Sequence, residues 1–154
     1  MKAKEYLRQI KRLDDAIMAK IDLLNTMNEM LTATGGTDFG SERVVSSAGE
    51  GMMTDRIIDK VDLEMEIRKD VEKYIRKKNR IINQVNGMID TRFQEILTLR
   101  YIAMKTEDGI RKNYTLAEVA DIMGYSYDHA RRLHGEALMA FTRLYLNEPG
   151  RNEE

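Results

Sequence analysis

The sequence contains no cysteine, no tryptophan, one proline and two histidines. Without cysteine the chain forms no disulfide and no cysteine-based metal site. The two histidines, His129 and His134, are five residues apart, which is poor spacing for two ligands of one metal on a helix. We therefore expect no metal and no cofactor. The single proline, Pro149, is close to the end of the sequence, so proline interrupts no long helix before it.

Long apolar runs are also missing. No stretch approaches the roughly 20 apolar residues that span a bilayer. The first residues, MKAKEYLRQIKRL, are amphipathic and lack the apolar core of a signal peptide. Charged residues make up 33% and hydrophobic residues 42% of the chain, a balance typical of folded proteins. We expect a cytoplasmic protein without a membrane partner.

A strong charge of either sign is absent as well, because the formal net charge is −1. Residues 91–146 carry 8 Lys/Arg against 7 Asp/Glu, which makes that segment nearly neutral. Non-specific affinity for DNA depends on basic residues that displace counterions from phosphates. If this segment binds DNA, we expect one copy to bind weakly and a dimer, or a partner already on the DNA, to be needed.

Residues 115–138 carry the pattern of a helix-turn-helix. Thr115 followed by Glu118 is a capping box, in which each side chain satisfies an amide at the helix start. Gly124 is suited to the left-handed residue that ends a helix, and Ser126 can cap a second, recognition helix over about 126–146. At helical spacing the apolar face of the first helix holds Leu116, Val119, Ala120 and Met123, and that of the second holds Ala130, Leu133, Ala137 and Phe141.

The opposite face of the second helix is the candidate for reading DNA. An arginine fork matches the O6 and N7 acceptors of guanine, so Arg131 and Arg132 suit a major groove, although an ordinary solvated helix face is the alternative. Asp128 can accept from the amino group of cytosine, and hydroxyls or amides at the helix start can meet a phosphate. For both histidines a place at the core edge and a phosphate contact remain open. The predicted DNA-binding residues are Ser126, Tyr127, Asp128, His129, Arg131, Arg132 and Gly135, with Met139 and Thr142 further along the same face.

Two long helices are expected before residue 90. Over residues 2–33, apolar residues recur every seven positions, which is the pattern of a coiled coil. A Gly- and Ser-rich loop follows at about 34–51, with the pair Val44–Val45 as a local anchor. A second helix runs from residue 52 or 54 to about 89. The two helices differ little in length, so we expect an antiparallel hairpin. Because each apolar stripe is broader than a two-position seam, we also expect the hairpin to oligomerise.

The second long helix carries a basic cluster on its polar face, with Lys78 as the one basic residue inside its apolar seam. A solvated face with intrahelical pairs is one explanation of the cluster, and contact with DNA backbone is the other. The cluster contains Arg68, Lys69, Lys73, Arg76, Lys77, Lys78 and Arg80, interleaved with Asp70 and Glu72.

The remaining segments complete the predicted organisation. A break at Asp90 and Thr91 precedes a third apolar helix that ends near Ala103 and should pack under the helix-turn-helix. Residues 105–114 form a polar connection, either an ordered wing or a mobile loop. The predicted domains are a hairpin at 1–90, a helix-turn-helix domain at 91–147 and a frayed tail at 148–154, in an all-α chain.

These segments resemble known families. The stretches RFQEILTLRYIA, TLAEVADIMGYS and HARRLHGEAL resemble the C-terminal helix-turn-helix of bacterial sigma factors. Together with KEYLRQIKRLD, SERVVSS and KVDLEMEI, they make nearly the whole chain similar to the ArpU-like family of small phage and prophage transcriptional regulators. In compact versions a short turn leads into the helix-turn-helix, whereas here MKTEDGIRKNY intervenes. The resemblance implies DNA binding and a role in transcription.

We therefore expect a sequence-specific DNA-binding transcriptional regulator of phage or prophage origin. Its partners would be double-stranded DNA, further copies of itself through the hairpin and, in one reading, RNA polymerase. One alternative is a small terminase subunit for DNA packaging, and another is an RNA-polymerase docking module without DNA affinity. An enzyme is not expected, because no nucleophile stands with a base and an orienting group at a recognisable spacing.

Overall fold

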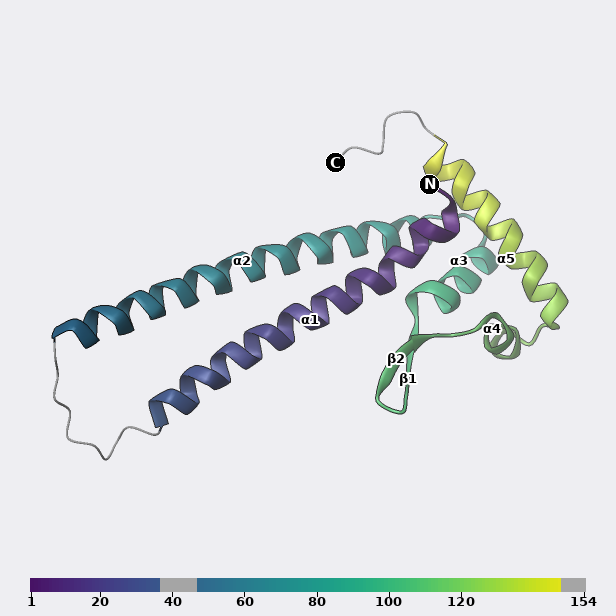
Figure 1. Cartoon of the computed structure of the whole chain (residues 1–154). Coiled ribbons are helices and arrows are strands. Elements are labelled where there is room, and N and C mark those ends of the chain that lie inside the picture. Colours follow the sequence, from purple (N-terminus) through teal and green to yellow (C-terminus); the bar gives the residue numbers. More distant parts are fainter. Residues whose placement is uncertain (37–46, 148–154) are drawn as a thin grey trace. The chain divides into compact units, whose positions relative to one another are not determined.

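The computed structural model describes residues 1–36 and 47–147, with side chains at 1–30 and 57–147. It confirms the predicted architecture of two long helices followed by a sigma-like helical domain, and it adds a small β-hairpin (Figure 1). In chain order the elements are α1 (Ala3–Gly36), α2 (Ser47–Asn86), α3 (Thr91–Leu97), η1 (Thr98–Ile102), β1 (Met104–Glu107), β2 (Ile110–Asn113), α4 (Leu116–Met123), α5 (Tyr127–Phe141) and η2 (Thr142–Leu146). The segments η1 and η2 are π-helical turns. Within the described ranges, none of the helices has both the length and the apolar content needed to cross a membrane.

The chain divides into two compact units. Unit 1 consists of residues 1–14 and everything from residue 76 onward, and unit 2 consists of residues 15–75. Each unit therefore contains one part of α1 and one part of α2. From the sequence we predicted a domain boundary at residue 90, and this boundary stays a prediction. The core of unit 1 contains residues on both sides of it, such as Val85 and Ile96.

The long helices differ from the expected ones at their ends. Helices cover both ends of the segment expected as a loop at 34–51, because α1 continues to Gly36 and α2 already begins at Ser47. A glycine inside a helix costs only about 0.5–1 kcal/mol, so the Gly-rich composition exaggerated the break. The anchor expected at Val44–Val45 lies outside the described residues. The far end of α2 is Asn86 and not Ile89, whose side chain is 94% exposed.

In unit 1, α1 and α2 run antiparallel. The Tyr6 hydroxyl donates to Oε1 of Gln84 at 2.8 Å, and Nζ of Lys78 donates to Oδ1 of Asp14 at 2.7 Å. Later residues of α1 thus meet earlier residues of α2. The antiparallel pairing expected from the sequence is confirmed here.

Among the described side chains of unit 2, at 15–30 and 57–75, few apolar ones are buried. Its helices are also paired antiparallel, with Nζ of Lys20 at 3.6 Å from Oδ2 of Asp70, and Ile17 and Ile67 are buried. Many other large apolar side chains remain exposed. These are Met18, Ile21, Leu23, Met30, Ile57, Ile58, Val61, Leu63, Met65 and Ile75, which we call the apolar surface of unit 2.

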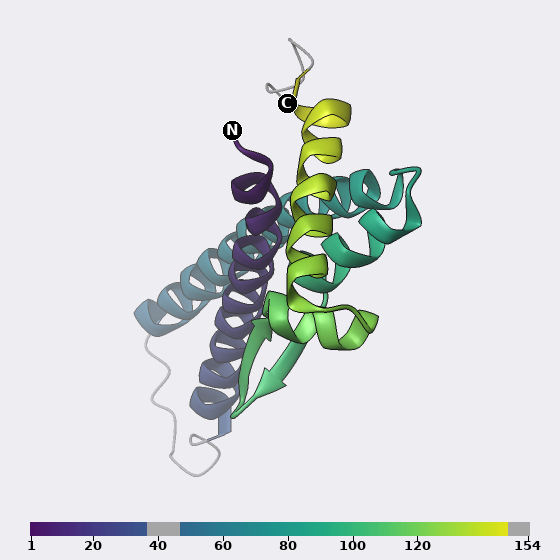
Figure 2. The ribbon, with the colours of Figure 1, turned by 90° about the vertical axis from the view of Figure 1, so that its right-hand side faces the viewer.

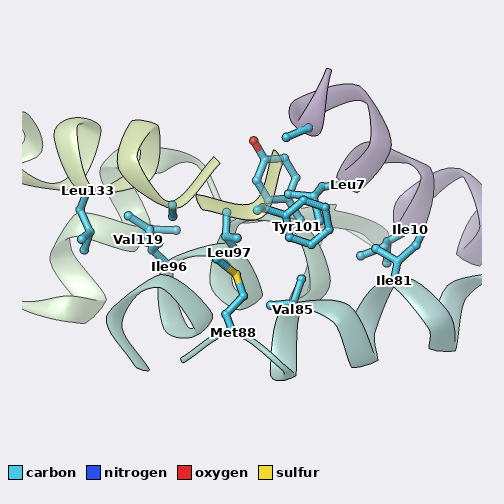
Figure 3. Packing of buried hydrophobic residues seen from close by; sticks show 13 residues of the cluster. Leu7, Ile10, Ile81, Val85, Met88, Ile96, Leu97, Tyr101, Val119 and Leu133 are labelled. Carbon is cyan, nitrogen blue, oxygen red and sulfur yellow. The ribbon is translucent and has the colours of Figure 1, made fainter. Parts of the chain in front are cut away.

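The hydrophobic core lies in unit 1 and is larger than a three-helix core. Helices α3, α4 and α5 pack together as expected, and the ends of α1 and α2 join them (Figure 3). Phe141 of α5 is fully buried, with its ring centroid 5.8 Å from Tyr6 of α1 and 5.0 Å from Tyr145 of η2. Buried members of the core are Ala3, Leu7, Ile10, Ile81, Val85, Met88, Ile96, Leu97, Tyr101, Val119, Leu133, Ala137 and Phe141.

A buried carboxylate joins three elements at one edge of this core. Asp14 of α1 is 6% exposed and pairs with Lys78 of α2. Its Oδ2 is 2.8 Å from Nη1 of Arg111 on β2, an ion pair without hydrogen-bond geometry. Lys78 is therefore the partner of Asp14 and not a mere interruption of the apolar seam. The cluster of Asp14, Lys78 and Arg111 links the β-hairpin to both long helices.

The connection between η1 and α4 is an ordered β-hairpin, which decides between the two forms left open by the sequence. Strands β1 and β2 pair antiparallel, with Glu107 opposite Ile110. The two turn residues, Asp108 and Gly109, have φ values of 53° and 77°, as a type I′ turn requires. The side-chain Nδ2 of Asn113 donates to the carbonyls of Tyr101 and Ala103 at 3.2 Å each, and so fixes the base of the hairpin.

Candidate nucleic-acid interface

Helix α4 begins with the predicted capping box. The amide of Glu118 donates to Oγ1 of Thr115 at 3.3 Å, and the amide of Thr115 donates to Oε1 of Glu118 at 3.2 Å. Lys105 of β1 also hydrogen-bonds the Glu118 carboxylate. This bond is the main reason why the pKa of Glu118 lies below its ordinary value. The carboxylate stays ionised and ties the β-hairpin to the start of α4.

A tight turn sets α5 against α4. Gly124 has a φ of 72°, a left-handed conformation that glycine adopts without strain, and the Tyr125 amide returns to the Ala120 carbonyl at 2.9 Å. Ser126 then caps α5, since its Oγ accepts from the His129 amide at 3.2 Å. Both predicted caps are present. The Ser126 hydroxyl accepts with its oxygen and keeps its proton for another partner.

The buried stripe predicted for α5 is confirmed. Ala130, Ala137 and Phe141 are 0% exposed and Leu133 is 4% exposed. Three turns of α5 are thereby fixed against the core. In Figure 2 the first turns of α1 run beside α5, in agreement with the contact between Tyr6 and Phe141.

The face opposite this stripe is open. All seven residues predicted to bind DNA, Ser126, Tyr127, Asp128, His129, Arg131, Arg132 and Gly135, are exposed. Nη2 of Arg131 is 3.9 Å from Oδ1 of Asp128, and their side chains are 67% and 78% exposed. Nε of Arg132 donates to the Asp128 carbonyl at 3.4 Å. Such long, exposed contacts are weak, so both guanidinium groups can turn to a stronger acceptor. Binding of DNA by these seven residues stays a prediction.

The two histidines have different surroundings. His129 is exposed and its ring lies 4.4 Å from that of Tyr125, centroid to centroid. His134 is half-buried, and its Nε2 lies 2.8 Å from the Tyr101 hydroxyl. Burial, together with the nearby cations Arg100 and Lys4, lowers the pKa of His134 to about 4. Of the two roles left open for His134, the structure favours the core edge, because a neutral imidazole does not attract phosphate.

This histidine should make stability sensitive to acid. Unfolded His134 would titrate near its ordinary pKa of 6.5, whereas the folded group does so near 4. Between these pH values the imidazole is protonated in the unfolded chain and neutral in the folded chain. The free energy of unfolding therefore falls as the pH drops from about 6.5 towards 4, and this group does not affect it above about pH 7. We expect His134→Gln, which can still bond Tyr101, to lose less stability than wild type between pH 7 and pH 5. Urea midpoints at both pH values measure this, and equal losses in the two proteins would contradict it.

Basic residues of α1 also lie near His134 and Tyr101, and sequence reasoning missed them. The positive charge of Lys4 contributes to the lowered pKa of His134. Burial raises the pKa of Tyr101, and the positive charge of Arg8 opposes that rise. Arg100 lies 5.5 Å from the centre of the Tyr101 ring and donates to the Tyr114 carbonyl at 3.2 Å. The four-residue spacing of Lys4 and Arg8 shows that both belong to one helix face, but only the fold shows that this face lies beside α5.

The division into units changes the electrostatic argument. Unit 1, residues 1–14 and 76–154, carries 18 Lys/Arg against 13 Asp/Glu, a net charge of +5. Residues 15–75 carry 7 Lys/Arg against 13 Asp/Glu, a net charge of −6. The near-neutral count for 91–146 therefore misses most of the positive charge packed around the helix-turn-helix. A unit with this charge suits a polyanion.

A capped helix-turn-helix with an open polar face, in a positively charged unit, defines the DNA-binding class of helix-turn-helix proteins. Residues 89–141 match the family Sigma-70, region 4. This part of the chain is thus a Sigma-70 region 4 helix-turn-helix domain, a kind that typically binds DNA and is not enzymatic. No curated protein and no solved structure matches the chain.

Proposed function

We propose that the protein is a sequence-specific transcriptional regulator of the phage or prophage kind, with α5 as its recognition helix. The observation that carries the proposal is the exposed face of α5, where Arg131 and Arg132 project from a helix fixed by its cap and its buried stripe. A rigid helix that presents two long donors is what reading of base edges in a major groove requires.

The roles of the residues follow from their places on the helix. Ser126 and Tyr127 stand at the N-terminus of α5, where hydroxyl and amide groups can approach a phosphate. Arg131 and Arg132 lie on either side of the centre of the open face. One can therefore reach a guanine edge while the other reaches backbone. Asp128, between them and the cap, disfavours phosphate and suits the amino group of cytosine.

Replacement of either arginine tests this function. We expect Arg131→Ala or Arg132→Ala to cost about 1–3 kcal/mol of binding on the preferred duplex and to reduce discrimination against a scrambled one. The fold should be unaffected, because neither side chain belongs to the buried stripe. Titrations with both duplexes at several salt concentrations provide the measurement. If both variants bind both duplexes as wild type does, α5 does not read DNA and a docking role on RNA polymerase is the better reading.

We further propose that the regulator self-associates through the apolar surface of unit 2. Exposed apolar side chains in this number on a helical pair are typical of surfaces that bury against another chain. A fragment of residues 91–154 would be a poor test, since it lacks core residues such as Leu7, Ile10, Ile81 and Val85. The full chain is the right material.

Added salt should strengthen this association. Two copies of unit 2 bring together two charges of −6, so screening strengthens an association that apolar contact drives. We expect the dissociation constant from sedimentation to fall between about 0.05 and 0.5 M salt, where DNA binding weakens. Ile58→Asn should weaken association, whereas Ile122→Asn in α4 should not, although both isoleucines are 52% exposed. A mass of one chain under all conditions, or equal effects of the two substitutions, would contradict the proposal; a closed ring would favour a terminase role.

A further inference from the structure

A groove lined by polar side chains lies on α2 beside η2. Its volume is about 490 Å³, and it is lined by Arg76, Asn79, Arg80, Asn83, Gln84 and Tyr145. The first four follow the i, i+3, i+4, i+7 spacing of one helix face. All six residues belong to unit 1, which also contains the helix-turn-helix.

The chemistry of the groove is that of an anion site. Two guanidinium groups, three amides and one phenol line it, and the lining includes neither a carboxylate nor an aliphatic side chain. Guanidinium forks pair bidentately with phosphate, and amides and tyrosine hydroxyls commonly donate to backbone phosphates of DNA. The donors of the groove therefore suit an extended phosphate chain.

Local packing holds the groove in shape. The Tyr6 hydroxyl donates to Oε1 of Gln84, and the ring of Tyr145 packs 5.0 Å from that of Phe141. Gly87 gives the Tyr145 hydroxyl room, because a Cβ at this position would lie 2.9 Å from it. Gln84 and Tyr145 are thus held in place by contacts with unit 1, and the exposed side chains of α2 complete the groove.

The side of α2 opposite the groove forms an ion pair with α1. Lys78, two residues from both Arg76 and Arg80, points to the buried Asp14 and pairs with it. Of the basic cluster read from the sequence, Lys78 therefore holds the fold together, and Arg76 and Arg80 line the groove.

We propose that this groove binds backbone phosphates of the double-stranded DNA that α5 reads. The proposal rests on the proposed function. The groove lies beside the end of η2, and Ser126 lies at the other end of the continuous α5–η2 segment, about 28 Å away at a rise of 1.5 Å per residue. Base reading and phosphate binding would then be separate surfaces of one unit. The groove adds the sequence-independent affinity that two arginines on α5 do not supply.

The experiment uses the full chain with Arg76→Gln and Arg80→Gln together. The matched control is Lys60→Gln with Arg68→Gln, an equal charge change on the same helix but in unit 2. We expect the groove variant to bind the preferred and the scrambled duplex at least about tenfold more weakly, with their ratio unchanged. The slope of log affinity against log salt should become shallower by about two, since each neutralised phosphate contributes roughly 0.9. The control should bind as wild type.

A second variant guards against an effect on folding. Asn83→Asp is nearly isosteric, lies on an exposed position and places a carboxylate in the groove. It should weaken both duplexes equally while the circular dichroism spectrum and thermal midpoint stay at wild-type values. Wild-type affinity in this variant, a groove variant with an unchanged salt slope, or a change in the ratio of the two duplexes would each overturn the proposal.

Two competitors identify the source of the phosphate. At fixed ionic strength, millimolar inorganic phosphate and poly-glutamate should leave DNA binding unchanged. Displacement of DNA by the first would make the groove a site for free phosphate, and displacement by the second would make it a site for acidic protein, and either result overturns the proposal. If the groove variants match the control while Arg131→Ala or Arg132→Ala loses discrimination, the groove fails and the proposed function stands. If wild type binds neither duplex, both fail.

Discussion

Replacement of Phe141 by alanine is expected to lower the free energy of unfolding by about 3–5 kcal/mol, the usual cost of removing a buried phenylalanine. Phe141 is 0% exposed and stands between Tyr6 of α1 and Tyr145 of η2. The cavity would open where α5, η2 and α1 meet. Chemical denaturation monitored by circular dichroism measures the loss.

Met139→Ala is the control for this substitution. Met139 is on the same helix and 58% exposed, so its removal should change stability by less than about 0.5 kcal/mol. A double-mutant cycle with Tyr6→Leu should show coupling, because the two rings are in contact. If Phe141→Ala costs no more than Met139→Ala, the described core is wrong at its centre.

The second large effect is expected at Asp14. Removal of one member of a fully buried ion pair costs about 3–5 kcal/mol, because the partner stays buried and uncompensated. The side chains of Lys78 and Arg111 are 26% and 44% exposed and can recover some solvation. We therefore expect Asp14→Ala to cost about 2–3 kcal/mol. The amides of β1 and β2 should also exchange faster with solvent, since Arg111 is their tie to α1.

Asp59→Ala provides the comparison for Asp14, since it makes the same charge change at an exposed position of α2. It should leave both the unfolding free energy and the exchange of the hairpin amides at wild-type values. Protection of the hairpin that survives Asp14→Ala would show that Asn113 and Lys105 hold it without the cluster. The cluster of Asp14, Lys78 and Arg111 would then have no structural role in the hairpin.

Local signals in the sequence were reliable guides to the helix-turn-helix. The Thr115–Glu118 box, the left-handed Gly124 and the Ser126 cap all involve residues within a few positions of each other. Such short-range rules depend on backbone geometry alone and survive any tertiary arrangement. The Asp108–Gly109 pair is a local signal of the same kind, because these residues favour a type I′ turn. This pair favours a β-hairpin at residues 105–114, where an ordered wing and a mobile loop were both expected from the sequence.

Long-range partners could not be read in this way. Asp14 and Lys78 are 64 residues apart, and Tyr101 and His134 are 33 apart, so no periodicity connects them. The division of charge between the two units has the same origin, because it appears only when the ends of α1 and α2 are known to pack with α5. Candidate site residues on one exposed helix face were predictable, whereas the groove on α2 required Tyr145 from a distant segment.

The central claim is that α5 reads base edges in a major groove, and single-atom changes in DNA test it most directly. Replacing guanines of the preferred duplex one at a time with 7-deazaguanine removes only the N7 acceptor that an arginine fork uses. Wild type should lose about 1–3 kcal/mol of binding at one guanine or more, and Arg131→Ala or Arg132→Ala should lose nothing further at that position. If no such replacement changes the affinity of wild type, or if both variants respond as wild type does, α5 does not read guanine in the major groove and the account of this site is wrong.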